Sequence, residues 1–82
     1  MRRRILEVLE HEWLTRTELA AALAAEVAEV EPVLNELRGE GAVEIVRLRR
    51  SPAEFGLTTP EWRVTDAGRR ELERLRARAE SG

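Results

Sequence analysis

The sequence contains no cysteine, lysine, tyrosine or glutamine, and only one histidine and one aspartate. The absence of cysteine excludes disulfides, thiolate metal sites and cysteine nucleophiles. The single histidine, His11, and the single aspartate, Asp66, leave few groups for acid–base catalysis or for a set of metal ligands. We therefore expect no enzymatic activity, no cofactor and no metal, and a domain that acts by binding a partner.

Long apolar runs are also missing. The longest stretch of low polarity, residues 19–25, is far shorter than the roughly 20 residues needed to cross a bilayer. The arginines at positions 2–4 resemble the start of a secretory signal, but Glu7, Glu10 and Glu12 interrupt the segment that follows. We therefore expect a cytoplasmic protein without a membrane partner.

The charged residues make up 37% of the chain and are divided unevenly along it. Residues 1–46 hold five arginines and ten glutamates, a net charge of −5. Residues 47–82 hold nine arginines and six acids, a net charge of +3, and the two parts sum to the overall −2. We therefore expect a folded surface with regions of opposite sign.

The length of 82 residues suffices for one small domain with a single hydrophobic core. Apolar residues at helical spacing predict a first, amphipathic helix over residues 2–12. Thr15 followed by Glu18 is the pattern of a capping box, which predicts a second helix that runs to about Ala25.

A third helix is indicated by an apolar stripe with i, i+4, i+7 spacing: Val30, Leu34 and Leu37. Pro32 is expected in the first turn, because further inside a helix its ring would clash with a preceding carbonyl. Gly39 and Gly41 are expected to end this helix.

The second half of the chain predicts a hairpin followed by a helix. Residues 43–49 are rich in β-branched side chains and predict a strand, and residues 61–65 alternate polar and apolar side chains and predict another. The segment 50–60 contains two prolines and one glycine and is expected to be the loop between them. Thr65 or Asp66 is expected to cap the last helix.

Six large side chains are expected to be largely buried: Ile5, Leu19, Leu23, Leu34, Leu37 and Trp62. Trp62 should face the core together with Val64, which lies two residues further along the same strand. Trp13 is also expected in the core, because two tryptophans in a domain of this size are usually buried.

Two parts of the sequence carry recognisable motifs. The first is Thr17-Glu18-Leu19-Ala20, followed by the apolar stripe of the third helix and by Gly41-Ala42-Val43. The second is the segment 62–68 with Leu72. With these motifs the sequence resembles the MarR and PadR families of bacterial regulators. The resemblance covers roughly residues 5–75. It implies a winged helix-turn-helix, which is a mainly α fold with a small β-hairpin.

The implied fold has a three-helix core, a two-stranded wing and a C-terminal helix. We expect a single winged-helix domain over residues 1–79 and a disordered tail over residues 80–82. The last helix carries a seam of heptad type, with intervals of four, three and four, that predicts a homodimer: Gly68, Leu72, Leu75 and Ala79. The alternative is that Leu72 packs onto its own domain.

The resemblance further implies a DNA-binding transcription regulator, in which the third helix enters the major groove and the wing lies along the backbone or minor groove. Between the apolar positions of the third helix, only Asn35 is suited to reading an adenine edge. Arginine forks suit phosphates and a narrow minor groove. The expected contacts with double-stranded DNA are Arg16, Asn35, Arg47, Arg49, Arg50 and Arg63.

The carboxylates of the third helix favour a different partner, because a carboxylate near a phosphate repels it. The alternative function is a protein–protein interaction module that binds a basic protein through acidic residues of this helix: Glu29, Glu31 and Glu36. A further alternative is that the arginines pair with the abundant glutamates on a solvated surface.

Overall fold

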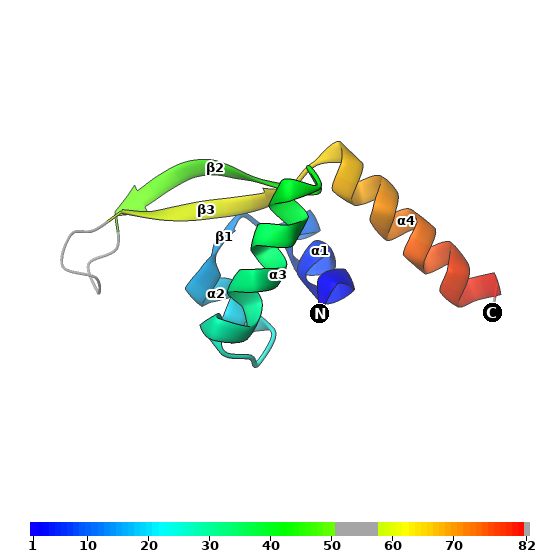
Figure 1. Cartoon of the computed structure of the whole chain (residues 1–82), viewed down its shortest axis with the longest axis horizontal. Helices are drawn as coiled ribbons and strands as arrows, with labels where there is room; N and C mark the ends of the chain where they lie inside the picture. Colours follow the sequence, from blue (N-terminus) through cyan, green and yellow to red (C-terminus); the bar gives the residue numbers. More distant parts are fainter. Residues whose placement is uncertain (51–57, 82) are drawn as a thin grey trace.

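The structure, a computed structural model, describes residues 1–50 and 58–81. The elements follow in the order α1 (Arg2–His11), β1 (Leu14–Thr15), α2 (Arg16–Ala22), α3 (Val27–Gly39), β2 (Val43–Arg50), β3 (Thr58–Val64) and α4 (Asp66–Ser81). The β2–β3 hairpin projects from one end of the group formed by α1, α2 and α3, and α4 projects from the other end (Figure 1). None of the helices in the described ranges has an apolar stretch long enough to span a bilayer.

In the described ranges the sheet has three antiparallel strands in the order β1-β3-β2. A short strand therefore joins the base of the two-stranded wing that the sequence predicts. Leu14 and Thr15 form this strand, and they pair with Trp62 and Glu61 of β3. Two residues are too few to show the alternation that marks a strand, which is why the sequence gives no sign of β1.

Both strands of the hairpin extend into the segment 50–60, which the sequence predicts to be a loop. This prediction is wrong at both ends, because β2 includes Arg50 and β3 begins at Thr58. The rest of the predicted loop, residues 51–57, lies outside the described residues. Pro60 is tolerated inside β3 because β1 does not extend alongside it, so the side of β3 away from β2 is open to a residue without an N–H.

The first two helices lie where the sequence predicts them and end slightly earlier. α1 ends at His11 and α2 at Ala22. The capping box that begins α2 is present: the side chain of Thr15 accepts a hydrogen bond from the backbone N–H of Glu18, and Glu18 accepts one from the backbone N–H of Thr15.

Pro32 lies inside α3, so its prediction in the first turn is wrong. The helix begins at Val27, and the side chain of Glu29 accepts a hydrogen bond of 3.4 Å from the backbone N–H of Glu26 just before it. Pro32 is therefore the sixth helical residue, where it cannot donate to the carbonyl of Ala28. Its ring is exposed to solvent rather than packed in the core.

The core lies between the helices and one face of the sheet, which we call the inner face. The inner face carries Val43, Ile45, Trp62 and Val64. The six side chains predicted to be buried are between 0% and 6% exposed. The prediction for Trp13 is wrong, because this side chain is 48% exposed. Its ring lies beside a cation, with the guanidinium carbon of Arg47 at 5.7 Å from the ring centroid.

α4 is attached to the body of the domain near its N-terminal end. The hydroxyl of Thr65 accepts a hydrogen bond of 3.1 Å from the backbone N–H of Gly68 and so caps the helix, as predicted. Gly68 is buried against Ala42, because a Cβ added to it would lie 2.1 Å from the Ala42 carbonyl oxygen. Leu72, one turn further on, is 0% exposed.

The two residues that attach α4 to the domain are also half of the predicted dimer seam. Gly68 and Leu72 both pack onto their own domain, and the alternative stated for Leu72 is therefore confirmed. Of the remaining seam residues, Leu75 is half-buried and Ala79 is exposed. α4 extends to Ser81, so the helix includes two of the three residues expected to form the tail.

Candidate nucleic-acid interface

The side of α3 that faces away from the core carries few charged residues. The buried residues of this helix are Val30, Leu34 and Leu37. Positions two residues away from these lie on the opposite side, because each residue turns a helix by about 100°. That side consists of five exposed residues: Ala28, Pro32, Asn35, Glu36 and Gly39. Asn35 therefore faces outward from the helix, and Glu36 is the one carboxylate on the same side.

Two of the three carboxylates predicted to bind a basic protein have internal contacts. Glu31 lies 3.3 Å from Arg16, at the start of α2. Glu29 holds the hydrogen bond that precedes α3. Glu36 is exposed and has no ion pair within the described ranges. The free acidic surface is consequently smaller than the sequence indicates.

A β-bulge determines which arginines of the wing lie on the same face. Ile45 pairs with Trp62, but Arg47 pairs with the adjacent residue of β3, Glu61, so Val46 is an extra residue in β2. Without the extra residue, Ile45 and Arg47 would share a face. With it, Arg47 points to the outer face of the sheet, where Glu61 lies.

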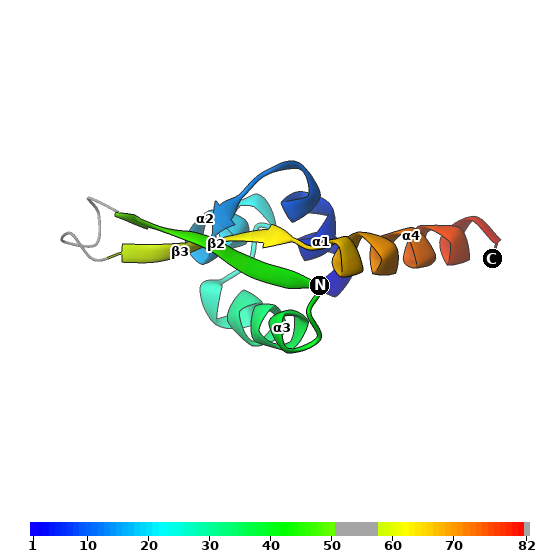
Figure 2. The ribbon, with the colours of Figure 1, turned by 90° about the horizontal axis from the view of Figure 1, so that it is seen from above.

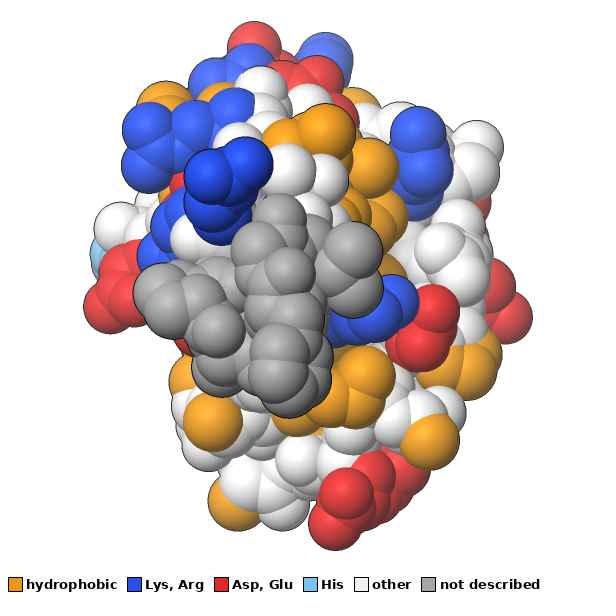
Figure 3. Space-filling view, turned by 90° about the vertical axis from the view of Figure 1, so that its left-hand side faces the viewer, with side chains coloured by type: hydrophobic (Ala, Val, Ile, Leu, Met, Phe, Trp, Pro, Cys, Tyr) orange, Lys and Arg blue, Asp and Glu red, His pale blue; other side chains and the backbone are white. Residues whose placement is uncertain are grey.

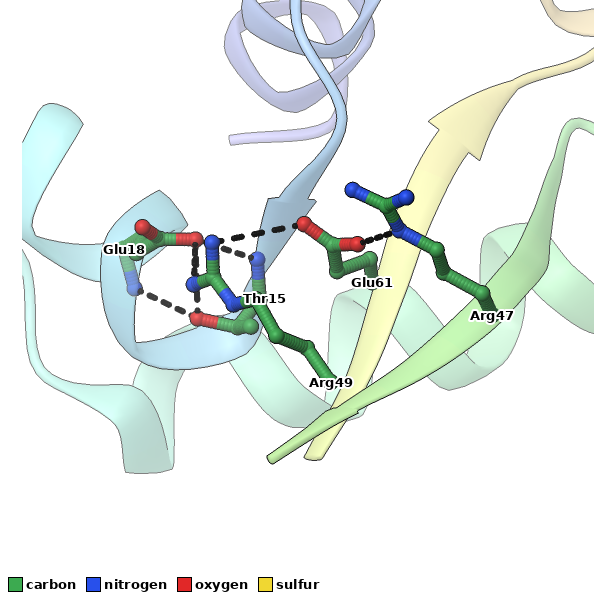
Figure 4. A network of polar contacts seen from close by, with 5 residues as sticks. All are labelled: Thr15, Glu18, Arg47, Arg49 and Glu61. Carbon is green, nitrogen blue, oxygen red and sulfur yellow. Dashed lines mark hydrogen bonds and ion pairs between the residues drawn. The ribbon is translucent and has the colours of Figure 1, made fainter. Parts of the chain in front are cut away.

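Glu61 is the centre of a polar network on the outer face (Figure 4). Its side chain is only 3% exposed. One carboxylate oxygen accepts a hydrogen bond from Nε of Arg47, and the other lies 3.4 Å from a terminal nitrogen of Arg49. The second terminal nitrogen of Arg49 lies 2.5 Å from Glu18. Two arginines and two glutamates thus form one network without net charge at neutral pH.

Glu18 connects this network to the start of α2. The backbone N–H of Thr15 lowers the pKa of the Glu18 carboxyl, and Arg49 lowers it further, while burial acts in the opposite direction. A carboxyl with a lowered pKa in the folded state stabilises the fold above its unfolded-state pKa. This contribution is lost as the pH falls through the lowered value. The ion pair between Arg49 and Glu18 thus holds the wing against the start of α2, and it is fully formed near neutral pH.

Arg47 and Arg49 share the outer face, but they use their guanidinium groups differently. Arg47 binds Glu61 through Nε, and its two terminal nitrogens have no ion pair with the described residues; its side chain is 62% exposed. Arg49 uses both terminal nitrogens, one on Glu61 and one on Glu18, and its side chain is 43% exposed. The terminal nitrogens of Arg47 (its open fork) therefore face solvent, whereas Arg49 connects Glu61 of β3 with Glu18 of α2.

The other two wing arginines also differ. Arg63 is paired across the strands with Glu44, with Nε at 2.5 Å from the carboxylate. Arg50 lies near the far end of the hairpin, is exposed, and has no ion pair within the described ranges. Arg50 pairs with Thr58, which shares the alternation of Trp62, so it lies on the inner side of the wing.

The predicted site therefore falls into two parts. The pairing of arginines with glutamates on a solvated surface holds for Arg16 and Arg63, whereas Arg47 and Arg49 contact Glu61, whose side chain is only 3% exposed. Asn35 and Arg50 lie on the side of the molecule that combines α3 with the wing. Figure 3 shows the molecule from the hairpin end: arginine side chains lie around the hairpin, and carboxylates lie mostly toward the margins.

The sequence predictions missed one exposed cation of α3, Arg38. Its guanidinium carbon lies 5.8 Å from the centroid of the Trp62 ring. Arg38 is the one cation of α3, which is a visible signal in the sequence. Its partner belongs to a distant strand, so the contact itself follows only from the fold.

Solved structures similar to this chain are transcription regulators. A PadR-like regulator from Bacillus cereus matches with a TM-score of 0.78 and 22% identity over 93% of this chain and 77% of that chain. A MarR family regulator matches with 0.74 and 26% over 98% of this chain and 50% of the other. Streptococcus pneumoniae FabT in complex with DNA matches with 0.72 and 21% over 98% and 52%.

The chain thus spans about half the length of the second and third of these regulators. No family model and no curated protein sequence matches it. The similarity rests on the order of the elements, on the three-helix core and on the sheet that closes into a wing. The chain has the winged helix-turn-helix fold.

Proposed function

We propose that this domain binds double-stranded DNA and acts as a transcription regulator. The observation that supports this most is the position of the outward side of α3, which carries a single carboxylate, beside an arginine-bearing hairpin. In this type of fold, the third helix enters the major groove and the wing contacts the backbone or the minor groove. One regulator of similar fold is described in complex with DNA.

Some of the proposed contacts read base edges, and the others bind backbone phosphates. Asn35, on the outward side of α3, has an amide suited to the edge of an adenine. Arg50 and the open fork of Arg47 are available to phosphates at once. Arg16, Arg49 and Arg63 can bind a phosphate only if the phosphate replaces their glutamate partner. Such an exchange adds less binding free energy than a new contact does.

A direct test is the salt dependence of binding to duplex DNA of random sequence. The logarithm of the affinity should fall linearly with the logarithm of the salt concentration, because each neutralised phosphate releases a counterion. Arg47 and Arg50 together contribute about −2 to this slope. Fluorescence anisotropy of a labelled duplex measures this slope. Glu31→Gln and Glu36→Gln should each strengthen binding, because each removes a repulsive charge beside α3.

The sign of the glutamine effect separates this function from the binding of a basic protein. If the acidic residues of α3 bind a basic partner, the same substitutions weaken that complex instead. Glu73→Gln on the exposed surface of α4 is the matched control, and it should leave the affinity for DNA nearly unchanged. A wild-type domain that does not bind DNA even at low salt would contradict the regulator function.

We also propose a homodimer that uses α4. Since Gly68 and Leu72 are buried in their own domain, the partner copy has to contact the rest of the helix. Leu75 and Ala79 remain for this contact, and Ala67 and Ala77 line a hollow along another side of α4. Light scattering at micromolar concentration should give twice the chain mass, and a mass near 9.4 kDa would exclude the dimer.

A further inference from the structure

Arg38 differs in its contacts from most of the other arginines near the proposed interface. Four of those arginines are held by a glutamate: Arg16, Arg47, Arg49 and Arg63. Arg38, in the last turn of α3, is exposed and has no ion pair with any residue in the described ranges. It lies over the ring of Trp62, which is 6% exposed and therefore fixed by its packing.

Arg38 lies in the angle between α3 and the hairpin. Trp62 is on the inner face of β3, opposite Ile45 of β2, and α3 contacts β2 on that side. α3 runs beneath the base of the hairpin, which continues beyond the helices as the wing (Figures 1 and 2). A cation held over Trp62 is therefore held where the helix and the wing meet.

The proposed complex places DNA backbone at this corner. α3 would occupy the major groove, and the wing would lie along the adjacent backbone or minor groove. The sugar–phosphate backbone that separates two adjacent grooves then has to pass between the helix and the hairpin. Its phosphates come to the angle in which Arg38 lies.

We propose that Arg38 binds a phosphate of this backbone and that Trp62 is its positioning residue, an assignment that rests on the proposed function. A guanidinium over an aromatic face keeps its N–H groups, which point along its own plane, available to a phosphate. Because the ring restricts the side chain beforehand, less conformational freedom is lost on binding.

The indole of Trp62 supports this role. Its Nε1–H is buried and has no hydrogen-bond partner in the described part of the chain, which costs stability. A phenylalanine would fill the core from the same strand without that cost. Tryptophan is the best aromatic platform for a cation, so the contact with Arg38 supplies a physical reason for tryptophan at this position.

Arg38→Ala should lower the affinity for random-sequence duplex about threefold to tenfold and reduce the salt slope by about one. Arg38→Lys keeps the charge and most of the slope, but it regains only part of the affinity because an ammonium lacks the planar fork. A role of Arg38 in helix stability alone would leave the slope unchanged. Arg78→Ala, at the far end of α4, is the control of equal charge.

A double-mutant cycle tests the positioning role. Trp62→Phe should weaken DNA binding in the wild-type background and have no further effect in the Arg38→Ala background. Equal weakening in both backgrounds would overturn the role of Trp62. If the wild type binds DNA and Arg38→Ala keeps its full affinity and slope, the assignment of Arg38 is overturned alone. If the wild type does not bind, the proposed function fails and both assignments fail with it.

Discussion

Replacing Arg47, Arg49 and Arg50 together with alanine is expected to abolish detectable DNA binding at physiological salt. Arg50 and the terminal nitrogens of Arg47 have no ion pair with the residues that the structure describes. Their removal eliminates about two phosphate contacts, and each contact contributes about 0.9 to the salt slope. Any binding that remains at low salt should therefore depend only weakly on salt. Anisotropy titrations at several salt concentrations measure both effects.

The three single substitutions should differ, because the three contacts differ. Arg50→Ala and Arg47→Ala should each lower the salt slope by about one. Arg49→Ala removes a side chain whose terminal nitrogens are already bound to Glu61 and Glu18, so the slope should barely change. Its effect should instead be a lower melting temperature, since the wing is no longer fastened to α2.

Arg74→Ala is the matched control for these substitutions. It removes the same charge from an exposed position of α4, away from the hairpin. We expect an almost unchanged affinity for a short duplex, because screening at physiological salt acts over about 8 Å. If Arg74→Ala weakens binding as much as Arg50→Ala does, binding follows the total charge and the wing has no particular role.

The sequence was sufficient to predict the order of the elements and most of the core. The apolar stripe of α3 and the capping box of α2 are local patterns, and local patterns identify helices well. α3 begins earlier than expected because its N-cap residue is Glu26, rather than the serine, threonine, asparagine or aspartate usual at such a position. Pro32 therefore lies deeper in the helix than expected.

The sequence was sufficient to predict most of the arginines of the candidate site, but not which glutamates they pair with. The outer-face position of Arg47 depends on one extra residue at Val46, and no sequence pattern marks that bulge. The contact of Arg49 with Glu18 depends on how the hairpin lies over the start of α2. Such contacts between distant parts of the chain determine which cations are free, and they follow only from the assembled fold.

Gly68→Ala is expected to have the largest effect on stability. Within a helix this change is ordinarily stabilising by up to about 1 kcal/mol. Here the new Cβ would lie 2.1 Å from the carbonyl oxygen of Ala42 and 2.6 Å from Cγ2 of Val64. The Ala42 carbonyl also accepts a hydrogen bond of 3.0 Å from the backbone N–H of Thr65, which limits how far it can retreat. α4 would have to move away from the sheet and uncover Leu72.

We therefore expect Gly68→Ala to lower the free energy of unfolding by about 3 kcal/mol, the upper end of the usual cost of overpacking. Gly39→Ala is the matched control, since it makes the same change at the end of α3, where a Cβ would meet no atom within 4 Å. It should be neutral or slightly stabilising. Urea denaturation of both variants measures the difference. Equal stability of the two would mean that α4 does not pack against Ala42, and that Leu72 is not buried by this contact.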